Sequence, residues 1–414
     1  MNQYSKRRED LLNSMKANCA FMLFSGKAIA KSADESYPFS VDRNFYYLTG
    51  LDAQEMVLLM YKIDGVAHEA IYILPYDEEL AKWVGGRMLA DEVTQISEIA
   101  EVNDLSQLDE DVSRLLNITR RDPEFKFLFD MWHYSLDQTT SLAIDYANKL
   151  KSKYPYLVIE DFFAKIAHAR LVKDEYEIAC MRKAIHITNL GIQQMMKTCK
   201  PGVNEATMEG VFDFVLKQVL CKEKSFETIA ASGKNATILH YSNNDQVMND
   251  GDLFLCDLGA RDRHYCADIS RTFPVNGTFS ERQKEIYEIV LGAQKIVEEN
   301  AKVGVKLKEL NKMVIDYYAE ELPKHGLNKD VREYYYHSCS HHIGLDCHDI
   351  NDGVCDTLEV GNVISNEPGL YIEDENIGIR IEDDLLITEN GAINLSQEII
   401  KSVEDIENLM KGHK

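Results

Sequence analysis

Four carboxylates occupy matching places in two distant segments of the chain. In each segment, an apolar run that follows a glycine ends in a carboxylate, Asp257 in the first and Glu367 in the second. A turn and another apolar run come next and carry a second carboxylate, Asp268 or Glu382. The repeat predicts a pseudo-symmetric domain whose two halves each contribute a carboxylate pair to one shared centre.

Such carboxylates cannot crowd together without cations, because neighbouring like charges raise one another's pKa sharply. Two divalent ions would remove the repulsion, and carboxylates with one histidine suit Mn²⁺, Co²⁺ or Zn²⁺. Held roughly 3.5–4 Å apart, two ions would acidify a bridging water into a hydroxide nucleophile near neutral pH. A single carboxylate is more often a surface residue, but Asp257 and Glu367 end apolar runs, where an unpaired charge is costly.

Three histidines at related spacing precede the second carboxylate pair. His337 and His341 are four residues apart, and His348 follows His341 by seven. One histidine alone is more often a core or surface residue, but three beside a predicted metal centre favour a function. The adjacent His342 is expected to point elsewhere on an extended backbone. His240, which precedes the first carboxylate strand, is a candidate substrate-binding group.

One arginine is placed to support the carboxylates. Arg380 stands two residues before Glu382, so both side chains project from the same face of an extended strand. Its guanidinium can therefore pair with a carboxylate of the centre and hold it in orientation.

The elements around these residues do not follow strict βαβ alternation, which favours an α+β layer with a largely antiparallel sheet. Ser280 and Gln283 have the form of a capping box at the start of a helix. Asn390-Gly391 is a hairpin signal. We predict helices over 171–198, 205–221, about 20 residues from 281 and 307–322, strands over 226–231, 252–257 and 265–273, and a short closing helix.

The preceding part of the chain has the pattern of a separate α/β domain. Asp64-Gly65 between two apolar runs predicts a hairpin. A chain of 414 residues exceeds what one core usually serves, so two domains are expected, 1–168 and 169–414. In the first we predict strands over 21–24, 55–63 and 69–75 and helices over 90–116 and 138–151.

The composition describes a folded, acidic protein. Its formal net charge of −24 disfavours nucleic acids and anionic membranes as partners. Nine cysteines, an odd number without CxxC spacing, argue for reduced thiols. The first residues lack the apolar segment of a signal peptide, and no apolar run approaches the roughly 20 residues that span a bilayer. These features predict a cytoplasmic protein.

Several motifs together resemble one family. They are ATILHYSNNDQ, NDGDLFLCDLGARDRHYCADISRTFPVNGTFS, HSCSHHIGLDCHD, NEPGLYI and GIRIEDDLLIT. In order and spacing they are similar to the pita-bread metallopeptidases, and most closely to those of the aminopeptidase P type. The segment YPFSVDRNFYYLTGLDAQEMVLL resembles the N-terminal domain that accompanies aminopeptidase P and prolidase. The resemblance covers almost the whole chain.

The resemblance implies an α/β N-terminal domain and a pita-bread catalytic domain with a pseudo-two-fold, largely antiparallel sheet. It also implies a role for each candidate residue. Glu367 would shuttle the proton, Tyr371 would line the substrate pocket, and Arg380 would support the ligands from behind. The implied substrate-binding and catalytic histidines are His240, His337 and His348. The implied metal ligands are Asp257, Asp268, His341, Glu367 and Glu382.

The implied activity is the release of the N-terminal residue from peptides with proline in second position, by attack of a metal-bridging hydroxide. Two Mn²⁺ ions are expected, with Co²⁺ or Zn²⁺ as alternatives, and the implied assembly is a homodimer or homotetramer. A prolidase, which cleaves only Xaa-Pro dipeptides, would use the same centre. A creatinase-like hydrolase without metal fits less well, because all five ligand positions hold competent residues. A binding protein without activity is the remaining alternative.

Overall fold

The computed structural model describes residues 1–414 apart from 16–17, 134, 137–140, 352–356 and 413–414. These residues form two compact units, Met1–Ala169 and Arg170–Lys414. Each unit has its own sheets and its own buried residues. Across the described ranges, every helix is too short or too polar to traverse a bilayer.

The first unit is built on a mixed sheet with the strand order β6-β5-β4-β1-β7-β8. β1, β4 and β5 pair antiparallel, whereas β6, β7 and β8 join in parallel. Asp64 and Gly65 take positive φ angles of 48° and 81° between β4 and β5, which confirms the predicted hairpin. The strands are β1 (Cys19–Phe24), β4 (Val57–Ile63), β5 (Val66–Ile73), β6 (Glu101–Asp104), β7 (Lys126–Phe129) and β8 (Val158–Asp161), with a small hairpin of β2 (Ala30–Ser32) and β3 (Glu35–Ser36).

Helices cover this sheet around an apolar core. Leu115 and Ala147 from two helices are buried in one cluster with Phe127 and Phe129 of β7. The helices are α1 (Gln3–Ser14), α2 (Arg43–Thr49), α3 (Glu78–Val84), α4 (Ala90–Ser97), α5 (Leu108–Ile118), α6 (Leu142–Lys153) and α7 (Phe163–Leu171). The α/β architecture predicted for this part of the chain is confirmed.

The prediction of one helix over 90–116 is wrong. The segment forms two helices, α4 and α5, separated by strand β6 and a short 3₁₀ turn. α4 ends where Glu98 takes a left-handed conformation. β6 then pairs with β5, with Glu101 opposite Ala70. Hydrogen bonding to the free edge of β5 therefore outweighs the local helical pattern.

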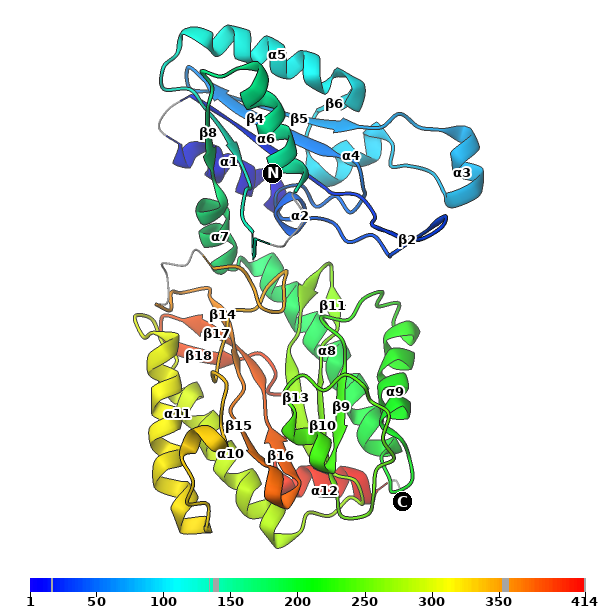
Figure 1. Ribbon diagram of the computed structural model, residues 1–414, viewed down its shortest axis with the longest axis vertical. Coiled ribbons are helices and arrows are strands. Elements are labelled where there is room, and N and C mark those ends of the chain that lie inside the picture. Colours follow the sequence, from blue (N-terminus) through cyan, green and yellow to red (C-terminus); the bar gives the residue numbers. More distant parts are fainter. Residues whose placement is uncertain (16–17, 134, 137–140, 352–356, 413–414) are drawn as a thin grey trace. The chain divides into compact units, whose positions relative to one another are not determined.

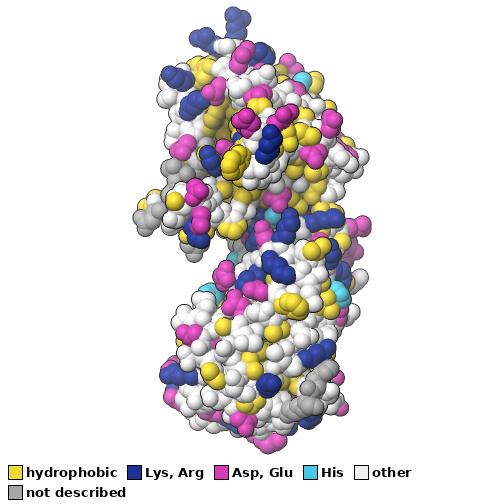
Figure 2. All heavy atoms as spheres, turned by 90° about the vertical axis from the view of Figure 1, so that its right-hand side faces the viewer, with side chains coloured by type: hydrophobic (Ala, Val, Ile, Leu, Met, Phe, Trp, Pro, Cys, Tyr) yellow, Lys and Arg dark blue, Asp and Glu magenta, His cyan; other side chains and the backbone are white. Residues whose placement is uncertain are grey.

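Large apolar side chains remain exposed on the first unit near α3 and α4. Trp83 and Val84 are 86% and 75% exposed. Tyr76 and Leu89 are about half exposed and line one surface hollow with Val84. Figure 2 shows hydrophobic side chains gathered on the face of this unit that it displays. Exposed apolar groups of this kind are typical of a surface that contacts another molecule.

The second unit consists of two halves built from similar elements. Each half has a pair of packed helices followed by an antiparallel sheet, β13-β10-β9 in the first and β14-β17-β18 in the second. Every strand pair described in this unit is antiparallel, as predicted. Figure 1 shows the strands in the centre of the unit and helices α8 to α11 outside them.

The elements of the first half are α8 (Glu175–Thr198), α9 (Glu205–Gln218), β9 (Ile229–Ser232), β10 (Leu253–Leu258), β11 (Arg261–Asp262), β12 (Tyr265–Cys266) and β13 (Ile269–Pro274). Those of the second half are α10 (Glu281–Asn300), α11 (Leu307–Glu321), β14 (Val363–Asn366), β15 (Gly369–Ile372), β16 (Ile377–Arg380), β17 (Asp383–Thr388) and β18 (Gly391–Asn394). The predicted closing helix is α12 (Val403–Lys411).

Local side-chain signals set where the long helices begin. Ser280 Oγ accepts the Gln283 N–H at 3.2 Å, and Gln283 Oε1 accepts the Ser280 N–H at 2.8 Å. These two bonds confirm the predicted capping box of α10. Asp174 and Glu177 form the same box at the start of α8.

The four carboxylates occupy equivalent places in the two halves. Asp257 lies near the end of β10, and Glu367 directly follows β14. Asp268 directly precedes β13, just as Glu382 directly precedes β17. The strand predicted over 265–273 is therefore interrupted at Asp268, which places each of these two carboxylates where a strand begins.

Gly378 of β16 lies against the 3₁₀ turn Gly233–Thr237. A Cβ atom at Gly378 would lie 2.0 Å from the carbonyl oxygen of Ala236. This neighbour is a backbone atom, so it could give way only if the turn shifted. β16 ends at Arg380, and the close contact therefore helps to set the strand that carries this arginine.

Replacing Gly378 with alanine is expected to destabilise the protein by roughly 1–3 kcal/mol, the usual cost of overpacking. Gly210 within α9 offers the matched control, because a Cβ there would meet nothing within 4 Å. Alanine at Gly210 should stabilise by about 0.5–1 kcal/mol, since it favours the helix. Denaturant unfolding measures both changes. An unchanged midpoint for Gly378→Ala would contradict the steric argument.

Candidate metal centre

A cavity of about 640 Å³ in the second unit gathers the candidate residues. Its walls come from both halves of the unit and include the apolar side chains of Phe226, Ile229 and Leu239. Tyr371 is not among the lining residues, because its side chain is buried behind them. The candidate residues that line the cavity are Asp257, Asp268, Glu367, Glu382, His240, His337, His341, His348 and Arg380.

Asp268, His341 and Glu382 form the tightest group in this cavity. One donor atom from each lies within 4.8 Å of the other two. His341 Nε2 is 3.3 Å from Asp268 Oδ2 and 3.4 Å from Glu367 Oε1. Donors from the two halves thus converge on one small volume, as a divalent ion requires of carboxylate and imidazole ligands.

Hydrogen bonds to the backbone orient His341 toward the carboxylates. Its Nδ1 lies 3.0 Å from the carbonyl oxygen of His342. A proton on Nδ1 would bond that carbonyl and leave Nε2 as the ligand atom. Its backbone N–H donates to Ser365 Oγ at 2.9 Å, and this hydroxyl donates to Glu367 Oε1 at 3.1 Å. The histidine and Glu367 are therefore positioned by one shared hydroxyl.

Arg380 links the carboxylates of the two halves. Its Nη2 donates to Asp257 Oδ2 at 2.7 Å, and its Nε donates to Ser270 Oγ at 2.7 Å. Ser270 Oγ in turn donates to Glu382 Oε2 at 2.7 Å. The expectation that Arg380 could pair with a carboxylate of the centre agrees with this geometry. Its partner is Asp257, which comes from the other half of the unit.

Burial and mutual repulsion disfavour negative charge on these carboxylates. Burial raises the pKa of Asp257 from 3.8 to about 7, and the charge of Asp268 adds to the rise while Arg380 opposes it. Burial also raises the pKa of Glu367, and it raises the pKa of Glu382 well above its ordinary value. Bound cations would relieve this strain by neutralising the carboxylates.

The donor set fits a divalent metal ion on a second ground. Asp257 Oδ1 is buried and has no hydrogen-bond partner, whereas its other oxygen is bound by Arg380. A buried carboxylate oxygen without a partner is costly, so an aspartate of this kind in the wall of a cavity lined by other donors is suited to bind a cation. The residues present therefore match the hard oxygen and nitrogen ligands that such ions take.

The remaining histidines lie around this cluster. His337 Nε2 is 2.9 Å from the hydroxyl of Tyr371, and its Nδ1 is 2.7 Å from the carbonyl oxygen of Ser338. Burial and the nearby charge of Arg380 lower the pKa of His337 to about 3, so the ring is neutral. The rings of His348 and His341 meet edge to face with centroids 4.4 Å apart. His240 is exposed at the cavity wall, and His342 does not line this cavity.

Sequence reasoning missed three residues that touch the cluster. Ser270 joins Arg380 to Glu382, and it follows Asp268 by two positions, a spacing that could have revealed it. Asp384 Oδ2 accepts the backbone N–H of Asp268 at 3.4 Å, and it likewise follows Glu382 by two. Cys347 Sγ lies 2.9 Å from Asp268 Oδ2. It stands in an irregular segment, where no periodicity points to it.

Comparison with known proteins identifies the family to which the chain belongs. Residues 179–389 match the family model described as metallopeptidase family M24, and residues 4–122 match the N-terminal domain of aminopeptidase P. The chain belongs to metallopeptidase family M24. This assignment makes it a hydrolase and confirms the predicted pita-bread fold and the resemblance drawn from the motifs.

Relatives and solved structures match nearly the whole chain. The Xaa-Pro aminopeptidase of Haemophilus influenzae is 34% identical over 99% of this chain and 97% of its own length. A Bacillus anthracis chain provisionally described as an aminopeptidase P superposes with a TM-score of 0.96 at 40% identity, covering 100% of this chain and 98% of its own. Zn-substituted Escherichia coli aminopeptidase P with product superposes with a TM-score of 0.90 at 31% identity, covering 100% and 98%.

The stability of the protein after removal of metal by a chelator is expected to fall as pH rises from about 4 to about 7. Asp257 has a pKa raised from 3.8 to about 7 in the folded chain. The folded state therefore holds a proton that the unfolded state releases, and this stabilisation is lost as pH rises through the folded pKa. Thermal unfolding at pH 5 and pH 8 tests it, with Asp257→Asn as the control that lacks this group. Identical pH dependence of the two proteins would refute the assignment.

Proposed function

We propose that the chain is an Xaa-Pro aminopeptidase, which removes the N-terminal residue from peptides that carry proline in second position. The observation that carries the proposal is the convergence of Asp268, His341 and Glu382 within 4.8 Å in a peptide-sized cavity. The match of residues 4–122 to the N-terminal domain of aminopeptidase P supports it. The likeness to Escherichia coli aminopeptidase P, which is 31% identical to this chain and was solved with the inhibitor Pro-Leu, also supports it.

In this proposal the centre would hold two divalent ions, with Asp268 and Glu382 as the carboxylates shared between the two halves of the site. Mn²⁺ is the expected ion, with Co²⁺ or Zn²⁺ as alternatives, and the Zn-substituted Escherichia coli relative supports the last of these. When bound, the ions would supply Lewis acidity and an acidified water to attack the peptide carbonyl. The proposed ligands are Asp257, Asp268, His341, Glu367 and Glu382.

Glu367 is the proposed proton carrier. The Oε1 atom of Glu367 accepts a hydrogen bond from Ser365 Oγ. The Oε2 atom of Glu367 lies 3.7 Å from His337 Nδ1 at the cavity wall. We infer that this carboxylate takes the proton of the attacking water and delivers it to the departing proline nitrogen. The geometry supports this role because Ser365 and the cavity wall hold the carboxylate on both sides.

The histidines and the apolar wall are proposed to select and hold the peptide. His240 and His348 would donate hydrogen bonds to the carbonyl oxygen as negative charge develops on it. The neutral His337, oriented by the Tyr371 hydroxyl, would hold the substrate backbone. The Tyr371 hydroxyl contacts His337 and Arg380. A direct contact of Tyr371 with the substrate stays a prediction. Phe226 and Leu239 offer an apolar surface for the proline ring, whose nitrogen has no N–H to donate.

The proposal extends to the chain as a whole. Residues 169–414 would form the catalytic domain and residues 1–168 an accessory domain. Exposed Trp83 and Val84 in the first domain support assembly into a homodimer or homotetramer. The described cysteines are free thiols, which supports a reducing cytoplasmic location. The net charge of −24 supports the absence of nucleic acid and anionic membrane partners.

Replacing Asp268 with asparagine should abolish both metal loading and turnover, because the ions would lose a shared anionic ligand. We expect activity to fall by at least about 100-fold, beyond the loss typical of residues behind the ligands. Metal analysis of the purified variant and a peptide assay measure the two effects. Asp250→Asn, in an exposed turn, is the matched control. Normal turnover by Asp268→Asn would show the mechanism to be wrong.

The length of the accepted peptide separates the two enzymes that could use this centre. With Mn²⁺, Co²⁺ or Zn²⁺ added in turn, we expect Xaa-Pro-Xaa peptides to be cleaved with higher kcat/KM than Xaa-Pro dipeptides. Chromatography that measures the released first amino acid over time gives the cleavage rates of both kinds of peptide. Cleavage of dipeptides alone would identify a prolidase instead. Absence of both stoichiometric metal and cleavage would identify a binding protein.

A further inference from the structure

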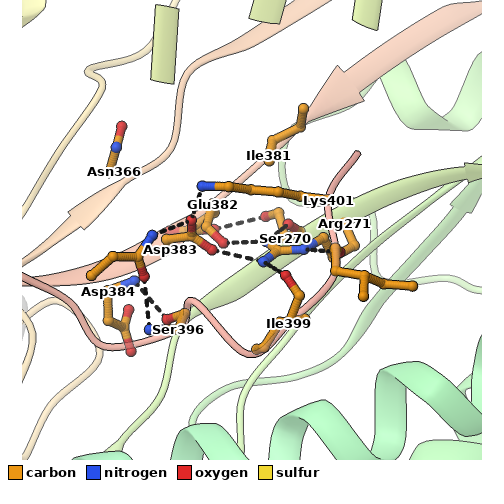
Figure 3. A network of polar contacts seen from close by, with 12 residues as sticks. Ser270, Arg271, Asn366, Ile381, Glu382, Asp383, Asp384, Ser396, Ile399 and Lys401 are labelled. Carbon is orange, nitrogen blue, oxygen red and sulfur yellow. Dashed lines mark hydrogen bonds and ion pairs between the residues drawn. The ribbon is translucent and has the colours of Figure 1, made fainter. Parts of the chain in front are cut away.

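Arg271, three residues after Asp268 in β13, is a buried arginine whose guanidinium is bonded to three separate segments. Its Nη1 donates to the carbonyl oxygens of Glu382 at 2.6 Å and Ser270 at 2.9 Å. Its Nη2 donates to Asp383 Oδ1 at 2.7 Å. Nη2 and Nε also donate to the carbonyl oxygens of Ile399 and Ile400, each at 3.0 Å. Figure 3 shows the guanidinium between Asp383 and the C-terminal segment.

The position of Glu382 explains why this contact matters. Glu382 lies between β16, which ends at Arg380, and β17, which begins at Asp383. It is therefore outside the ladders of both strands. Its N–H donates to the Ser270 carbonyl at 3.0 Å, and its own carbonyl accepts from Arg271. Residues of β13 thus hold the Glu382 backbone on both sides and replace the missing ladder.

The same arginine joins the two halves of the unit. β13 belongs to the first half and starts directly after Asp268, whereas Glu382 and Asp383 belong to the second. The carboxylates of Asp268 and Glu382 meet in the metal cluster. Arg271 therefore connects the two halves next to the place where Asp268 and Glu382 meet.

The network around Arg271 is closed by a second cation. Asp383 is fully buried, and its Oδ2 accepts from Asn394 Nδ2 at 2.8 Å and from Lys401 Nζ at 2.6 Å. A buried charged network is rigid when every member is satisfied. Lys401 shares Asp383 with Arg271, and it is 28% exposed. Its Nζ also donates to Gln294 Oε1 at 2.8 Å and lies 3.9 Å from Glu298 Oε2. Lys401 thus contacts Asp383 through Oδ2, whereas Arg271 contacts Oδ1 and holds the Glu382 backbone.

We propose that Arg271 is a positioning residue of the metal centre: by holding the Glu382 backbone against β13, it sets Glu382 at the spacing from Asp268 that metal binding requires. The proposal rests on the proposed function in one respect, the assignment of these two carboxylates as ligands. It adds a residue that touches neither metal nor substrate and acts through the backbone. Arg380 acts differently, because it reaches Asp257 and Ser270 through side chains.

The test compares Arg271→Lys with Lys401→Met. Lysine at 271 keeps the positive charge beside Asp383 but cannot make all the contacts of a guanidinium, so the hold on Glu382 is lost. Methionine at 401 removes the other cation of the same aspartate and leaves that hold intact. Calorimetric titration of the chelator-treated proteins with Mn²⁺ gives the affinity. Thermal unfolding before metal addition gives the loss of stability.

We expect Arg271→Lys to bind Mn²⁺ about 10–100-fold more weakly, the usual effect of removing a group that orients a ligand. Lys401→Met should stay within about twofold of the unaltered protein, as for a partly exposed substitution. At saturating Mn²⁺, Arg271→Lys should lower kcat while KM for an Xaa-Pro-Xaa peptide stays unchanged, because no substrate group is touched.

Two outcomes would overturn the proposal and show that Arg271 is only a structural residue. One is an equal weakening of Mn²⁺ binding in the two variants. The other is a lower melting temperature of Arg271→Lys with unchanged Mn²⁺ affinity. If Arg271→Lys does not fold, Asp383→Asn loosens the guanidinium by removing its charged partner. About threefold weaker Mn²⁺ binding is then expected, and unchanged affinity would also overturn the proposal. A protein that binds Mn²⁺ but cleaves no proline peptide would refute the proposed function and leave this comparison valid.

Discussion

The burial of several carboxylates close to one another is the constraint on which the second unit of this protein depends. Asp257, Asp268, Glu367 and Glu382 lie around His341 in one cavity. Burial raises the pKa of Asp257, Glu367 and Glu382. Taking an ion out of water costs several kcal/mol even after the surroundings relax. A fold that gathers these groups must supply positive charge, and the donor set shows where cations would supply it.

Fixed cations of the chain offset part of this repulsion and leave the rest to metal. Arg380 neutralises Asp257 from behind, and Arg271 with Lys401 neutralises Asp383 one residue from Glu382. Asp257 and Asp383 therefore each have a fixed cation of the chain as a partner, and the negative charge that remains around the cavity is left for metal ions to neutralise. The division explains how a carboxylate cluster can be preformed and still bind cations.

The pseudo-symmetric architecture makes this division possible. Each half places one carboxylate at or next to the end of a strand and a second one directly before the start of another strand. When two such halves face one another, four carboxylates meet although no short segment contains more than two of them. Ser270, Arg271 and Arg380 then connect the halves by hydrogen bonds, which turns an approximate symmetry into a defined geometry. The apolar cavity wall beside the carboxylates gives the centre its preference for a ring-bearing substrate in the proposed function.

Features that depend on neighbouring residues could be predicted from the sequence. The capping box at Ser280, the hairpin at Asp64-Gly65 and the antiparallel pattern of the second unit follow from short-range hydrogen bonding and periodicity. The helix predicted over 90–116 failed for the opposite reason, because β6 exists only when the edge of β5 is present to bond it. Local propensity is weak compared with such pairing.

The sequence by itself determined which side chains could bind a metal, since a repeated carboxylate pair and a cluster of histidines are chemical facts before they are structural ones. The tertiary structure alone decided which side chains face the cavity and which residues hold them in place. Tyr371 lies behind His337, Cys347 touches Asp268 from an irregular segment, and Arg271 grips the backbone of a residue more than a hundred positions away. Contacts between distant segments depend on how the two halves pack, and no periodicity in either half encodes that packing.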